Sequence, residues 1–159
     1  MIQRIIVSKA AKDALVYETG KFKYAETGGI LCGHYKSDAI IITSASGPGP
    51  NALHSIDQFI MDKDWMYTFI DREYEISKGL NIYVGEWHTH PETTPRPSIV
   101  DAKSIYERTL EWEYGDIVFI IIGFIDFSEI KIKDQIVAVC YEKESDSICE
   151  IPIQFQEDQ

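Results

Sequence analysis

The chain has 159 residues, of which 45% are hydrophobic and 26% are charged, a composition typical of folded globular proteins. Its length predicts one domain spanning residues 1–159. The formal net charge is −11 and the basic residues form no cluster, which argues against nucleic acid as a partner because phosphate binding needs grouped lysines and arginines.

The three cysteines and the apolar segments indicate a cellular compartment. Cys32, Cys140 and Cys149 have the spacing of no zinc motif, so we expect free, mostly buried thiols in a reducing compartment. The N-terminal residues lack the apolar core and cleavage site of a signal peptide. The longest apolar run, at 117–125, is too short to span a bilayer. We therefore expect a cytoplasmic protein with no membrane partner.

Strands and helices alternate irregularly in the first half of the chain. In chain order, the patterns predict a strand at 4–8, a helix at 9–20, strands at 28–36 and 39–46, and a helix at 62–79. Ser8 is expected to cap the first helix, and Gly20 and Gly79 are expected to end the two helices. The segment at 54–62 is ambiguous between a strand and a loop.

The second half of the chain predicts a strand at 81–90, a helix at 98–115, a strand at 116–125, and closing strands at 129–143 and 147–155. Because the run at 116–125 is continuously apolar, we expect a central strand buried on both faces. Trp87 is expected in the core. The order of elements indicates a mixed α/β (α+β) domain, since it does not alternate strictly as in a doubly wound fold.

Two of the four histidines lie two positions apart on the predicted strand at 81–90. Residues i and i+2 of a strand face the same side, so His88 and His90 present adjacent imidazoles and Thr89 faces away. A catalytic zinc needs three protein ligands and an open position for water. Asp101 is the third candidate, because a loop stiffened by three prolines can return the next helix start to the strand end. The spacing predicts a site for one catalytic Zn²⁺.

Hydrolysis at such a site needs two further groups. A bound zinc would lower the pKa of its water from about 15.7 to about 7, and a carboxylate must then accept the proton. Glu26, just before the Gly-rich strand at 28–36, is the first candidate; Glu86 and Glu92 are the alternatives. Ser98 lies one helical turn before Asp101, where its hydroxyl could stabilise an oxyanion.

The same residues also have a purely structural interpretation. Ser98 and Asp101 fit the N-cap and N3 positions of a capping box, and an acidic residue there interacts favourably with the helix dipole. A histidine pair alone is more often a surface or core feature than a ligand pair. The metal interpretation is favoured by the conjunction of the pair, the proline loop and the helix start. The spacing of His34 and His54 requires no role for either.

These residues resemble the JAMM motif of the JAB/MPN-plus metalloproteases. His88, His90, Ser98 and Asp101 match the pattern H-x-H-x7-S-x2-D at every position. Glu26, in the sequence ETGGILCG, resembles the family's upstream glutamate before its Gly-rich strand. The likeness covers the whole chain. It implies a cytidine-deaminase-like JAB/MPN fold, with a mixed, mainly antiparallel sheet flanked by helices.

The resemblance implies a zinc isopeptidase that cleaves after the C-terminal tail of a ubiquitin-like or similarly conjugated protein. His88, His90 and Asp101 would hold the zinc. Glu26 would act as general base and then as acid for the departing amine, and Ser98 would steady the oxyanion. The family's longer eukaryotic members carry insertions that grip a ubiquitin chain. This chain has little room for such insertions, so selective polyubiquitin-chain cleavage is not expected.

A closer likeness, carried by GPGPNALH, FIMD and GEWHTHP, is to small prokaryotic JAB deconjugases of anti-phage operons. One group accompanies cyclic-nucleotide-synthase (CBASS) systems and removes the synthase from proteins to which it has been conjugated. Another group belongs to bacterial ubiquitination-like operons. The implied partners are a conjugated protein substrate, such as a cyclic-nucleotide synthase, and E1- and E2-like proteins of the same pathway.

Two other functions stay open on the sequence. A JAB peptidase that processes a sulfur-carrier or ubiquitin-like protein in a biosynthetic pathway would carry the same residues. A non-catalytic MPN scaffold would bind partners without chemistry. Such scaffolds typically lack parts of the metal motif, whereas all five residues are present in this chain.

Overall fold

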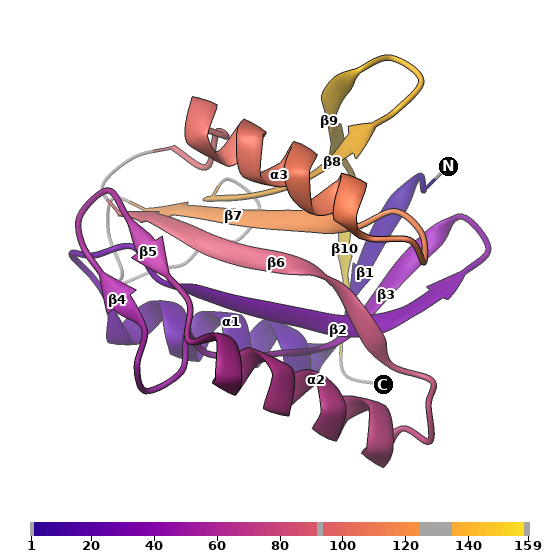
Figure 1. Ribbon diagram of the computed structural model, residues 1–159, viewed down its shortest axis with the longest axis horizontal. Helices are drawn as coiled ribbons and strands as arrows, with labels where there is room; N and C mark the ends of the chain where they lie inside the picture. The colour runs from indigo at the N-terminus through magenta and orange to yellow at the C-terminus, as the bar shows by residue number, and fades with distance from the viewer. Residues whose placement is uncertain (1, 92–93, 125–134, 158–159) are drawn as a thin grey trace.

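The computed structural model describes residues 2–91, 94–124 and 135–157, and its centre is one eight-stranded sheet (Figure 1). The strand order is β10-β1-β3-β2-β6-β7-β8-β9. The strands are β1 (Arg4–Val7), β2 (Gly28–Lys36), β3 (Ala39–Ala45), β6 (Ile82–Pro91), β7 (Val118–Phe124), β8 (Ile136–Glu142), β9 (Ser147–Ile151) and β10 (Ile153–Phe155). Four of the seven neighbouring pairs are antiparallel, which confirms the predicted mixed, mainly antiparallel sheet.

Helices cover both faces of the sheet (Figure 1). One core cluster joins Leu15 of α1 (Lys9–Lys21) to one face of the sheet. The other cluster joins the opposite face to Phe69 of α2 (Lys63–Ile76) and Ile105 of α3 (Ile99–Glu111). The predicted α+β class is therefore confirmed. None of the helices in the described part of the chain is both long and apolar enough to cross a membrane.

The ends of all three helices differ from the sequence-based expectation. Helix α1 continues through Gly20 to Lys21, because a glycine in a last turn lowers helix propensity without preventing the turn. Helix α2 ends at Ile76, where Lys78 and Gly79 take φ angles of 55° and 83° and reverse the chain. Helix α3 stops at Glu111, four residues before the predicted end at 115.

Two segments need separate comment. The ambiguous segment at 54–62 contributes to a small hairpin of β4 (Leu53–His54) and β5 (Phe59–Ile60), which is not part of the large sheet. The closing strand predicted at 129–143 is described only from its later part, as β8, because residues 125–134 lie outside the described ranges.

The two ends of the eight-stranded sheet meet at Pro152. Strands β9 and β10 are separated only by this proline, yet they stand at opposite ends of the strand order. Strand β10 pairs in parallel with β1, and the Ile5 amide donates to the Pro152 carbonyl oxygen at 2.9 Å. The sheet therefore twists far enough for one end of each outer strand to meet at this proline.

The pairing of β2 with β6 requires glycine at its start. Gly28 is the register partner of His88, and a Cβ on Gly28 would lie 2.2 Å from the Trp87 carbonyl oxygen. Trp87 itself is 1% exposed, which confirms its predicted core position, and its Nε1 donates to the Ser46 carbonyl oxygen at 2.9 Å. The close approach of the two backbones brings the segment before β2 beside the histidine pair.

We expect Gly28→Ala to lower the free energy of unfolding by about 1–3 kcal/mol, because the added methyl group must push β2 away from β6. Chemical denaturation monitored by circular dichroism measures this change. Gly20→Ala is the matched control: Gly20 lies within α1, where alanine has the higher helix propensity, so its stability should stay the same or rise. Equal stability of Gly28→Ala and the unmodified chain would contradict the packing argument.

Candidate metal centre

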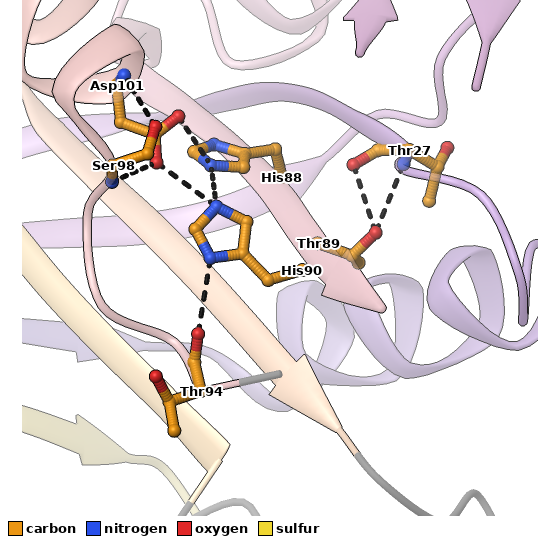
Figure 2. A network of polar contacts seen from close by, with 7 residues as sticks. All are labelled: Thr27, His88, Thr89, His90, Thr94, Ser98 and Asp101. Carbon is orange, nitrogen blue, oxygen red and sulfur yellow. Dashed lines mark hydrogen bonds and ion pairs between the residues drawn. The ribbon is translucent and has the colours of Figure 1, made fainter. Parts of the chain in front are cut away.

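His88, His90 and Asp101 converge at the end of β6. Both histidines lie on β6, and Asp101 lies in the first turn of α3. The two Nε2 atoms are 3.1 Å apart, and they lie 3.2 Å and 3.1 Å from the two carboxylate oxygens of Asp101. Figure 2 shows the three side chains pointing toward one another. Among the described residues, this is the only group of at least three His, Cys, Asp or Glu side chains placed to hold a metal ion.

The spacing of these atoms fits a zinc ion. Two ligand atoms that share one tetrahedral Zn²⁺ at about 2.0–2.1 Å lie about 3.3 Å apart, close to the separations in this group. The Nδ1 of His90 lies 3.2 Å from the carbonyl oxygen of Thr94 (Figure 2). A proton on Nδ1 satisfies this contact, so Nε2 could bind a metal through its lone pair once it has lost its own proton.

Asp101 and His90 stabilise each other's charged forms. Burial by itself lowers the pKa of His90, but the hydrogen bond and charge of Asp101 outweigh burial, so this pKa is raised. Burial also opposes ionisation of Asp101, yet hydrogen bonds from His88 and His90 hold the pKa of that carboxyl well below its usual range. Asp101 is therefore an anion throughout the physiological range, and it would compensate part of the charge of a bound cation.

The predicted capping box at the start of α3 is present. Ser98 is the N-cap residue; its Oγ accepts the Asp101 amide proton at 3.1 Å, while the Ser98 amide donates to Asp101 Oδ2 at 2.7 Å. This oxygen is also the one that lies 3.1 Å from His90 Nε2. The same carboxylate caps helix α3 and lies beside the two imidazoles, so its role as a cap does not exclude the metal interpretation.

Thr89, between the two histidines, faces away from them as predicted and holds the segment that carries Glu26. Its Oγ1 accepts the Thr27 amide proton at 3.0 Å, and its own amide donates to the Thr27 carbonyl oxygen at 2.8 Å. Figure 2 shows this threonine pair on the opposite side of β6 from the imidazoles. Glu26 is thus tied, through its neighbour, to the strand that bears the histidine pair.

Glu26 lines the same groove as His88, His90 and Asp101, which we call the metal-type cluster. This groove has a volume of about 720 Å³, and its lining includes Glu26, His88, His90, Ser98 and Asp101. Burial raises the pKa of Glu26, and the charges of His88 and His90 offset only part of that effect. The structure therefore brings all five residues of the predicted site into one concave surface.

Glu86, one of the two alternative bases, is engaged by other side chains. Glu86 lines the same groove, but its carboxylate accepts from Arg108 at 3.2 Å and from the Tyr83 hydroxyl at 3.1 Å. Both contacts are made to the same oxygen, Oε1, and they hold the Glu86 carboxylate toward Arg108 and Tyr83. Glu92, the other alternative, lies outside the described residues. His34 contacts the side chain of Asn81 at 3.2 Å and is not in the groove lining.

His54 is not in the groove lining, but it contacts the backbone of Glu26, which the sequence did not predict. Its Nδ1 lies 2.9 Å from the backbone carbonyl oxygen of Glu26, so this nitrogen carries a proton and donates it. The Glu26 amide donates in turn to the Ser55 carbonyl oxygen at 2.8 Å, and the His54 ring stacks on Phe22 at 3.9 Å between centroids. The hairpin of β4 and β5 thereby holds the Glu26 backbone through two hydrogen bonds. No spacing pattern could show this, because 28 positions separate the two partners.

Comparison with known proteins gives two kinds of likeness. A protein named probable metalloprotease from Sinorhizobium fredii is 28% identical over 107 residues, which is 66% of this chain and 65% of the relative. A CD-NTase/cGAS isopeptidase from Escherichia coli is 30% identical over 100 residues, which is 63% of this chain and 64% of that protein. The chain thus spans just under two thirds of both relatives.

The second kind of likeness concerns the fold and the family. A protein from Desulfitobacterium hafniense, known from a solution structure, superposes with a TM-score of 0.72 at 19% identity, covering 97% of this chain and 94% of that protein. The sequence model described as prokaryotic homologs of the JAB domain matches residues 8–133, which include all five predicted site residues. The match extends over far more than half of the chain, so the protein belongs to the family of prokaryotic homologs of the JAB domain.

Proposed function

We propose that this protein is a zinc-dependent peptidase that hydrolyses an isopeptide or peptide bond after the C-terminal tail of a conjugated protein. The observation that carries the proposal is the convergence of a metal-type cluster and a half-buried carboxylate in one groove. The names of the two relatives, a metalloprotease and an isopeptidase, support the same reaction class. A scaffold that binds partners without chemistry would not need this cluster.

His88, His90 and Asp101 would hold the ion through the three atoms that already face one another. A zinc ion bound there would polarise the scissile carbonyl group and lower the pKa of a water molecule. The two imidazoles are neutral donors, and Asp101 supplies one negative charge. This donor set keeps a net positive charge at the ion, as a Lewis acid requires.

Glu26 would accept the proton of the attacking water and then deliver it to the departing amine. A general base of this kind works best with a pKa near the working pH, and burial moves the pKa of Glu26 in that direction. The backbone contacts from Thr89, Ser55 and His54, each made to Glu26 or to the next residue, limit the movement of this segment. A base held in place in this way needs little reorganisation during the reaction.

Ser98 would stabilise the oxyanion that develops on the scissile carbonyl group. Its Oγ acts as an acceptor for the Asp101 amide, so the hydroxyl proton is available for a second hydrogen bond. Capping fixes the position of Ser98 relative to Asp101, and it therefore also fixes the hydroxyl beside the cluster.

For the substrate, we propose a conjugate between a cyclic-nucleotide synthase and a lysine of another protein. The relative from Escherichia coli is named a CD-NTase/cGAS isopeptidase, which supports this substrate class. E1- and E2-like enzymes of the same pathway would form the conjugate. A sulfur-carrier peptidase would instead cleave a carrier precursor, so an assay that supplies both substrates to the purified chain separates the two functions.

Asp101→Asn should lower zinc affinity by more than about 100-fold, because the variant loses the anionic ligand. The amide oxygen of asparagine can still accept from the Ser98 amide, so helix α3 should keep its cap. Elemental analysis and chelator competition measure the zinc bound per chain. Asp57→Asn, in the lining of the same groove, is the control and should bind zinc normally. Full zinc occupancy of Asp101→Asn at unchanged affinity would remove Asp101 from the ligand set.

Glu26→Gln should lower kcat for conjugate cleavage by about 100- to 10,000-fold while zinc binding is retained, because the amide cannot accept a proton. Single-turnover cleavage of the purified conjugate gives the rate. Glu86→Gln is the matched control, since Glu86 lines the same groove but is paired with Arg108, and its kcat should change by less than about threefold. A larger loss in Glu86→Gln than in Glu26→Gln would transfer the role of base to Glu86.

His54→Phe should lower kcat by about 3- to 10-fold with KM and zinc content unchanged, because phenylalanine can stack on Phe22 but cannot donate to the Glu26 carbonyl oxygen. His54→Asn supplies an amide donor at a position similar to Nδ1 and should recover part of the rate. Steady-state kinetics over a range of pH tests this, since a misplaced Glu26 also changes the pH profile. Identical profiles for His54→Phe and the unmodified chain would show that His54 does not position the base.

A further inference from the structure

Two of the three cysteines face each other across the last hairpin of the sheet. Cys140 on β8 and Cys149 on β9 are direct register partners of the antiparallel pair, so their side chains project from the same face. Directly opposed residues in such a pair have Cα atoms about 4.5 or 5.5 Å apart, depending on the hydrogen-bonding position. Both separations fall within the range of about 4.4–6.8 Å that a disulfide bond spans.

The thiol pair is accessible, unlike the third cysteine. Cys140 and Cys149 are half-buried and line a cavity of about 530 Å³ next to Pro152, where the two edges of the sheet meet. Cys32 is 0% exposed within the core between β2 and the helix α2, and burial raises the pKa of its thiol to about 12. The chain therefore offers one accessible pair and one inert cysteine for comparison.

We propose that Cys140 and Cys149 are a redox modification site, where a small-molecule disulfide such as oxidised glutathione converts the two thiols into one cross-strand disulfide. The Cys149 thiolate attacks one sulfur of the oxidant, forms a mixed disulfide and releases one thiol. The Cys140 thiolate then attacks Sγ of Cys149, closes the protein disulfide and releases the second thiol. The protein loses two electrons and two protons, and the oxidant gains them as two thiols.

The surroundings of the two sulfurs decide which of them reacts first. Cys140 packs against the core cluster that contains Ala138, and burial raises the pKa of its thiol to about 11. Cys149 is not among the described residues that pack against this cluster, so we assign the attack on an external oxidant to Cys149. The second step is intramolecular, so a small fraction of Cys140 thiolate is sufficient.

The disulfide would link β8 to β9 beside the closure of the sheet at Pro152. It would restrict the unfolded chain without requiring a new backbone arrangement, because the two residues are already register partners. We expect the oxidised protein to unfold at a temperature about 2–10 °C higher than the reduced protein, and added dithiothreitol should reverse the shift.

The test uses the purified full chain, first reduced and then equilibrated with mixtures of reduced and oxidised glutathione. The expected product is a monomer that has lost two hydrogen atoms, with a single Cys140–Cys149 cross-link in the non-reduced peptide map. Cys32→Ser should form the same cross-link. Cys140→Ser should retain one glutathione on Cys149, because the mixed disulfide can no longer be resolved.

Three results would overturn the proposal. They are a wild-type chain that stops at glutathione adducts, a cross-link that includes Cys32, and a disulfide between two copies of the chain. The site does not depend on the proposed peptidase function, since the experiment requires neither metal nor substrate.

Discussion

The antiparallel pairing of β2 with β6 is the contact on which the candidate site depends. Gly28 lies opposite His88 without a side chain, so the two backbones approach closely enough for the threonine pair of Thr27 and Thr89 to form. The alternation of the strand then places Thr89 on the side that holds the Glu26 segment and both imidazoles on the other side. One ladder thus positions the proposed base and two of the proposed ligands.

Asp101 connects this ladder to helix α3. A carboxylate that only caps a helix usually lies at the surface, where water solvates its charge. The side chain of Asp101 is only 15% exposed, so it has lost most of its contact with water. Its withdrawal is compensated by three partners, the Ser98 amide and the two imidazoles. The same partners orient both oxygens, so the cap and the cluster stabilise each other. A short capping box is therefore sufficient to place the third proposed ligand without a longer structural element.

Local patterns predicted the elements of the fold well and their ends poorly. Alternation and apolar runs located most strands of the large sheet, because burial of one or both faces constrains every position along a strand. The single strand predicted at 147–155 is divided at Pro152 into β9 and β10. Helix ends depend on a few side chains and on neighbouring elements, so α1 continues past Gly20 and α2 ends three residues before Gly79. The parallel pairing of β10 with β1 had no local signal at all, since it joins the two ends of the chain.

The sequence by itself determined the donor types of the site, their spacing and the cap that places Asp101, because these are properties of residues two to thirteen positions apart on one strand, one loop and one helix start. Only the tertiary structure decided which partners Glu86 and His54 contact and which two cysteines are register partners. Glu26 and Glu86 differ in their partners, and His54 and the opposed thiols are brought to their contacts by strand register. Register is set by packing across the whole sheet, and no local pattern specifies it.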